Sequence, residues 1–166
     1  LADLSQRSVR AWELFEAATA DVDLTGRTRS RGQTARDLLV PLGAWPDARG
    51  IHGMVADARA DVTDVESESV AADRLRSAHA AARDAAVLAR VRRSRDHIAT
   101  WFSGPAAAVE VELVSPSPLG PVPIGTMVHA AVFQLAVTAR DLRPAGAAEV
   151  PELDELGVVA LVDSSG

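Results

Sequence analysis

Cysteine and tyrosine are absent from this chain, and tryptophan and phenylalanine supply only three residues each. Without cysteine there can be no disulfide, no thiolate metal site and no cysteine nucleophile. The few aromatic rings leave little for the base stacking on which single-stranded nucleic acid binding depends. Lysine is missing as well, because all 17 basic residues are arginine. We attribute this bias to a GC-rich coding genome and not to phosphate recognition.

Long apolar runs are also missing, since no stretch approaches the ~18 consecutive residues that cross a bilayer. The first residues lack the pattern of a signal peptide. A net charge of −6 argues against nucleic acid and anionic membranes as partners. The absence of cysteine fits a reducing compartment. We therefore expect a single cytoplasmic domain over residues 1–166, which is long enough to bury a sizeable core.

Apolar spacing predicts helices through most of the chain. A first helix is expected over residues 3–20, followed by a polar connection at 21–33. Thr34 is placed to cap a second helix. Pro41 lies inside that helical pattern, where its ring removes a backbone hydrogen bond, so we expect a kink or an end there. A further helical piece follows at 47–60.

The second half of the chain continues this pattern after an acidic stretch. A long helix is predicted over ~69–102 and a short strand over 109–114, where apolar and polar residues alternate. Residues 115–125 hold four prolines and two glycines and form a rigid crossover. Helices at 126–143 and from 151 onward complete the chain. The predicted fold class is all-α, a helical bundle with one long crossover and a kinked second helix.

The helix at 126–142 is apolar nearly all round, which predicts a central position in the fold. One thin polar line interrupts it, formed by Gln134, Thr138 and Asp141 at i, i+4, i+7 spacing. Polar groups on such a helix are expected to face an internal cavity. This line is the strongest functional candidate in the chain. The alternative is a polar seam that hydrogen-bonds a neighbouring helix.

Four phrases, in this order, resemble the mycothiol-dependent maleylpyruvate isomerase family, which belongs to the DinB-like metalloenzymes. They are GQTARDLLVPLGAW (32–45), VLARVRRSRDHIATW (87–101), VHAAVFQLAVTARDL (128–142) and LGVVALVDSSG (156–166). The resemblance covers most of the chain and implies a DinB-like four-helix bundle. Relatives in this family often carry a further C-terminal domain similar to sterol carriers. The domain at 1–166 can therefore stand alone or open a longer protein.

The resemblance also implies a zinc-type metal held by a His on the second helix and a Glu-x-x-x-His pair on the apolar helix. Matching the phrases places Pro41 where the first His belongs. Gln134 replaces the Glu, and Thr138 replaces the second His. Proline has no side-chain donor, glutamine is neutral, and threonine is a weak ligand. We therefore expect no metal and no cofactor. Trp45, close after Pro41, is expected to pack between helices as a large core or rim residue; the alternative is that it lines the vestigial cavity.

Other candidates are weaker. The four histidines show no i, i+3 or i, i+4 pair that would suggest a metal site. The run of Arg90, Arg92, Arg93 and Arg95 could bind a carboxylate or phosphate, although a solvated helix face is the simpler interpretation. The acidic residues of 57–73 lack the spacing of a calcium loop.

Two functional hypotheses follow. The first is a metal-free, degenerate member of the family that acts as a small-molecule-binding or interaction module. Its expected partners are a small polar ligand and a second copy of the chain, with neither nucleic acid nor membrane. The second is an isomerase-like or thiol transferase-like enzyme that uses the vestigial cavity without zinc. Burial distinguishes them, because an enzyme requires a solvent-reached pocket lined by the polar line and a module does not.

Overall fold

The computed structural model describes residues 1–118 and 120–164, so Ser165 and Gly166 of the terminal phrase lie outside the described residues. This part of the chain is mostly helical, which confirms the all-α prediction. Its α-helices are α1 (Ala2–Thr19), α2 (Ala35–Leu39), α3 (Gly50–Arg59), α4 (Glu68–Ala78), α5 (Asp84–Ser103), α6 (Ala107–Glu110), α7 (Ile124–Asp141) and α8 (Pro151–Ser164). Two short 3-10 helices, η1 (Val40–Leu42) and η2 (Arg143–Ala145), follow α2 and α7.

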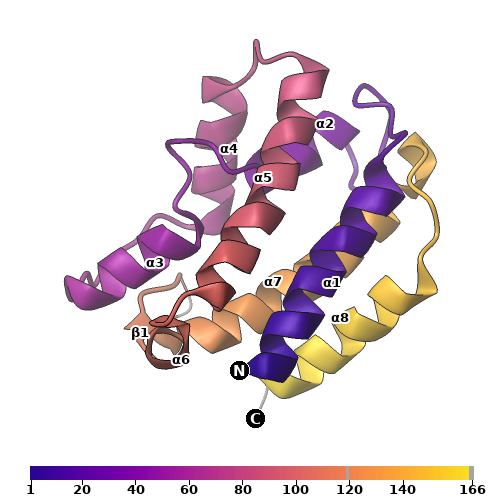
Figure 1. The fold of residues 1–166 in the computed structure, drawn as a ribbon. Helices are drawn as coiled ribbons and strands as arrows, with labels where there is room; N and C mark the ends of the chain where they lie inside the picture. The colour runs from indigo at the N-terminus through magenta and orange to yellow at the C-terminus, as the bar shows by residue number, and fades with distance from the viewer. Residues whose placement is uncertain (119, 165–166) are drawn as a thin grey trace.

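The helices pack as two connected groups (Figure 1). α7 packs against α8 and α1, which also contact each other, and α1 continues the packing onto α5. On its other side α5 contacts α2, α3 and η1, while α4 packs against η1. The larger core cluster includes the fully buried Phe15, Leu39 and Leu135. None of the helices in the described ranges is long and apolar enough to cross a membrane.

The start and end of α2 follow the sequence signals. The Thr34 side chain accepts a hydrogen bond from the Asp37 amide, and the Asp37 carboxylate accepts one from the Thr34 amide, so the two form a capping box. α2 ends at Leu39, and the chain continues as η1 with Pro41 in its first turn. The predicted interruption near Pro41 is confirmed, because proline cannot donate to the preceding turn.

The long helix predicted over 69–102 is wrong, because the chain breaks between α4 and α5 at residues 79–83. These residues contain no proline or glycine, so the sequence carries no stop signal there. The break is stabilised from outside. The Arg36 guanidinium donates to the carbonyl oxygens of His79, Ala80 and Ala82, which a continuous helix would have used internally.

The strand predicted over 109–114 is also largely wrong. Residues up to Glu110 form α6, and pairing begins only at β1 (Val114–Ser115), which is antiparallel to β2 (Val122–Pro123). Because residues 109 and 110 belong to this helical turn, their side chains do not alternate between two faces as they would in a strand. Glu110 is buried and accepts a 2.6 Å hydrogen bond from the Trp101 indole, as well as one from Arg59. This buried contact of Glu110 favours the helical turn over the strand that the alternating sequence predicts.

Candidate functional site

The polar line of α7 consists of residues in three different environments. Thr138 is only 5% exposed, Gln134 is exposed, and Asp141 is half-buried. Because positions 134 and 138 are one turn apart, the Gln134 amide Nε2 donates to Thr138 Oγ1 at 3.3 Å. The buried hydroxyl thus has its partner on its own helix, and Gln134 reaches solvent. The structure brings these two predicted residues together, at the edge of the helix packing.

Asp141 has a different role. Its carboxylate accepts a 2.9 Å hydrogen bond from the Ser30 hydroxyl, and its backbone carbonyl accepts one from the Arg29 amide. Both contacts attach the 21–33 connection to the C-terminal end of α7. Asp141 therefore holds a loop in place, and its carboxylate is engaged in that attachment.

Pro41 and Trp45 lie together on the segment between α2 and α3. Trp45 is buried, and its indole Nε1 donates to the Val40 carbonyl at 2.8 Å. One face of the indole stacks on the His79 ring, with centroids 3.8 Å apart, and the Arg90 guanidinium lies 5.4 Å from the ring centroid. These contacts make Trp45 a packing centre for η1, α4 and α5.

The two halves of the candidate site are not joined by side-chain bonding. Among residues 1–118 and 120–164, no hydrogen bond links Pro41 or Trp45 to Gln134, Thr138 or Asp141. η1 packs mainly against α4, α2 and α5, whereas α7 packs mainly against α8 and α1. The close approach of Pro41 to the Gln134–Thr138 pair, which the family alignment implies, stays a prediction.

Apolar side chains fill the region behind the polar line. The predicted stripe of α7 is confirmed as core, and each of its members is at most 7% exposed: Val128, Val132, Leu135, Ala139 and Leu142. Most of these residues join Phe15 of α1 and Leu39 of α2 in one continuous cluster. Thr138 is therefore the one polar side chain among the buried residues of α7, and the others are apolar.

The three aligned positions do not fit a divalent metal. The Thr138 hydroxyl is already held by Gln134, and a neutral amide and a proline add no anionic or imidazole donor. More broadly, no group of three or more His, Asp or Glu side chains with the geometry to hold a metal occurs in the described part of the chain.

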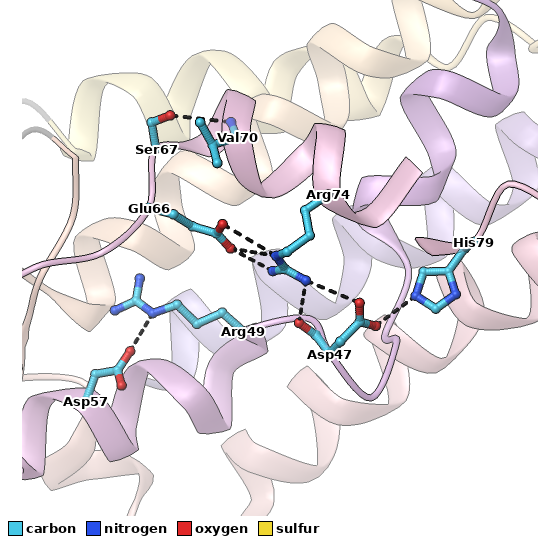
Figure 2. A network of polar contacts seen from close by, with 8 residues as sticks. All are labelled: Asp47, Arg49, Asp57, Glu66, Ser67, Val70, Arg74 and His79. Carbon is cyan, nitrogen blue, oxygen red and sulfur yellow. Dashed lines mark hydrogen bonds and ion pairs between the residues drawn. The ribbon is translucent and has the colours of Figure 1, made fainter. Parts of the chain in front are cut away.

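A polar network around Asp47 is a feature that the sequence did not indicate (Figure 2). One Asp47 oxygen lies 2.7 Å from Nε2 of His79, and the other lies 3.2 Å from the Arg74 guanidinium, which also binds Glu66. The hydrogen bond with His79 lowers the pKa of Asp47, and that with Arg74 lowers the pKa of Glu66. An Asp–His pair can serve as a general base. Here the imidazole lies flat on Trp45, so the pair fastens α4 to the segment before α3.

A second unexpected pairing joins His52 of α3 and His97 of α5. Both residues are exposed, and their ring centroids are 6.1 Å apart. Sequence spacing could not reveal this pair because the residues lie on different helices. A shallow hollow of about 590 Å³ on α5 adjoins His97 and is lined partly by Arg92 and Arg93. The arginine run is thus partly a solvated helix face, and Arg95 within it is paired with Glu16.

The most unusual surface belongs to α8. Four large apolar side chains of this helix are exposed: Val158 at 60%, Val159 at 44%, Leu161 at 46% and Val162 at 67%. We call these four residues the α8 face. A hollow of about 360 Å³ lies beside it, lined by Arg140, Asp154, Glu155, Val158 and Val159. An exposed apolar group of this kind is in the range of the largest patch on an ordinary monomer, and such patches are often functional.

Comparison of the chain with protein-family models, with curated proteins and with solved structures gives no match.

Proposed function

We propose that this chain is a metal-free, degenerate member of the maleylpyruvate isomerase-like, DinB-like family that acts as an interaction module. The proposed fold is a DinB-like four-helix bundle. Its kinked second helix corresponds to α2 and η1, and its long crossover corresponds to the segment between α5 and α7. The ordered phrases of the sequence and the helix end before Pro41 support this assignment.

One observation carries the choice of a module over an enzyme. The Thr138 hydroxyl, at the centre of the candidate site, is buried and bonded to Gln134, with apolar core behind it. A substrate would have to displace that bond and find room among side chains that are almost completely buried. The neighbouring α8 face, in contrast, is apolar and exposed, which suits recognition of another surface.

Native mass spectrometry of the purified chain tests this choice. We expect masses built from the 17.4 kDa chain alone, and well under one equivalent of Zn, Ni or Fe after dialysis. A small molecule that is bound at one equivalent and is lost in Gln134→Ala would contradict a role in protein interaction alone and would favour a ligand site at the polar line. The matched control is Gln6→Ala, which removes another exposed glutamine, on α1.

Restoring the family's donors tests the family assignment separately. The triple variant Pro41→His, Gln134→Glu, Thr138→His is expected to bind about one zinc ion, because three donors at ~2 Å from one metal form a site. Each single variant is expected to bind none. Circular dichroism verifies that the triple variant folds. A folded triple variant without zinc affinity would contradict the alignment.

A further inference from the structure

His52 and His97 differ from the other two histidines of the chain, which already have a structural environment. The His79 ring is bonded to Asp47, and His129 is half-buried, with a pKa that burial lowers. Within the described ranges, His52 and His97 are exposed and take part in no hydrogen bond or ion pair, and their one ring contact is with each other. Their ring nitrogens are therefore free to bind a ligand.

Two packed helices hold this pair. α3, which carries His52, contacts α5, which carries His97. Ile51 and Ile98, the residues next to the two histidines, are buried in the same core cluster. The backbone at both histidines is thus fixed, whereas their side chains lie outside the core. A ligand that bridges the two rings would need only side-chain rotations, which keeps the ordering cost low.

The distance between the rings suits one shared metal ion. A metal–nitrogen bond of ~2.0–2.1 Å places the ion about 3.2 Å from the centroid of an imidazole ring, so two rings on one ion have centroids at most about 6.4 Å apart. The centroids of His52 and His97 are 6.1 Å apart, with an angle of 63° between the ring planes. Rotation of exposed side chains turns the nitrogen edges inward and closes the remaining distance.

Charges on α5 limit the strength of such a site. Arg93, one turn before His97, has no ion pair in the part of the chain that the structure describes, and its positive charge opposes a cation. Because both side chains are exposed, water screens most of this repulsion. The Asp96 carboxylate is held by Arg95 at 2.8 Å, so it is not a ready third ligand. The site therefore has two protein donors and leaves the other positions to water.

The donor type indicates which metals fit. Imidazole suits Cu²⁺, Ni²⁺ and Zn²⁺, with Cu²⁺ bound most tightly, whereas Mg²⁺ and Ca²⁺ require oxygen ligands. Two of the four donors of a structural zinc site supply roughly half of its binding free energy, which corresponds to a zinc dissociation constant on the order of 1–200 μM. On α3, Arg49 is paired with Asp57 at 2.6 Å and adds no unpaired charge.

We propose that His52 and His97 together bind one divalent transition-metal ion, with Cu²⁺ preferred. The ion links α3 to α5, and the site is separate from the aligned family positions on η1 and α7. Zinc held with micromolar affinity is lost on dialysis, so this site is compatible with a chain that is purified without metal. The proposal goes beyond the proposed function and does not depend on it.

Isothermal titration calorimetry of the full, untagged chain in a non-coordinating buffer tests the proposal. We expect one Cu²⁺ per chain, weaker binding of Zn²⁺ and none of Mg²⁺. His52→Ala and His97→Ala are each expected to weaken Cu²⁺ binding at least ~10-fold, because each removes one of two donors. The matched control, His129→Ala, is expected to bind as the native chain does. No binding at 1 mM Cu²⁺, or binding that either of the first two variants leaves unchanged, would overturn the proposal.

NMR with Zn²⁺ provides a second readout. The imidazole signals of His52 and His97 are expected to shift together, while those of His79 and His129 stay in place. A shift of only one ring of the pair would overturn a shared site. Arg93→Gln should bind Cu²⁺ at least as tightly as the native chain, because it removes a like charge; weaker binding would overturn a site for a cation.

The two metal experiments remain separate when the restored family site is measured in a chain that also carries His97→Ala. Zinc bound there reports on the family alignment alone, and Cu²⁺ bound by the native chain reports on His52 and His97 alone. Either proposal can therefore fail without the other.

Discussion

The position of α8 depends on a close helix crossing at Gly157. A Cβ atom added there would lie 2.6 Å from the Ala136 Cβ and 3.9 Å from the Phe133 Cα. Ordinary contacts of this kind are 3.4 Å or longer, so Gly157→Ala requires α8 to move by about 1 Å away from α7. Both atoms belong to helix interiors, and neither can give way by rotating a side chain.

The magnitude follows from two opposing effects. Alanine in a helix interior is favoured over glycine by ~1 kcal/mol. Forcing a methyl group into a well-packed crossing costs about 1–3 kcal/mol. Because a 2.6 Å contact is far inside van der Waals distance, we expect the upper part of that range, about 2–3 kcal/mol, and therefore a net loss of ~1–2 kcal/mol in the free energy of unfolding. For a chain of this length, each kcal/mol lowers the Tm by about 2–4 °C.

Urea and thermal unfolding followed by circular dichroism measure the effect. Ala136→Gly is the diagnostic partner change, because it removes the atom that the new methyl group meets. The double variant Gly157→Ala, Ala136→Gly should be more stable than the sum of the two single effects predicts. If Gly157→Ala alone were as stable as the native chain, the crossing would not be as tight as described and the reasoning would be refuted.

Three further predictions concern polar contacts elsewhere in the fold. The His79 hydrogen bond lowers the pKa of Asp47, so the stability from this pair is present above the ordinary carboxyl pKa and is lost as the pH falls through the lowered pKa. His79→Gln should therefore raise the pKa of Asp47, which NMR titration would measure. An unchanged pKa would contradict His79 as the cause. Glu110→Ala should cost ~2–3 kcal/mol by leaving the buried Trp101 indole without an acceptor, and Glu110→Gln should cost less, which urea unfolding would check. Arg36→Gln should speed amide hydrogen exchange at residues 79–88, and equal exchange rates would show that this guanidinium does not stabilise the helix break.

Local signals determined which parts of the fold could be predicted. The cap at Thr34, the interruption at Pro41 and the helix end at Ser103 each depend on a residue with a strong backbone preference. The break after Ala78 depends instead on Arg36, more than forty residues earlier in the chain. A tertiary contact of that kind leaves no mark in the segment that it bends.

In the candidate site, too, local sequence determined some features and contacts between distant segments determined the others. The sequence was sufficient to place Gln134 and Thr138 one turn apart and to predict their polar character. Their exposure depends on which face of α7 the neighbouring helices cover, and an apolar helix offers several such faces. The His52–His97 and Asp47–His79 contacts join residues of different elements, so no spacing rule could have found them.

In α8, composition alone would predict a fully buried helix, although one side of the helix is exposed. A helix with five valines and leucines in positions 156–162 suggests a buried element, and one side of it is indeed buried. The residues that make the close crossing are Gly157 and Ala160, because only small side chains let α8 approach α7. Once the small residues occupy the inner side, the helical period forces the large ones outward. Tight packing accounts for the small residues on the inner side alone, because polar side chains would fit equally well on the outer side. The valines and leucines exposed there are therefore not explained by packing within the chain.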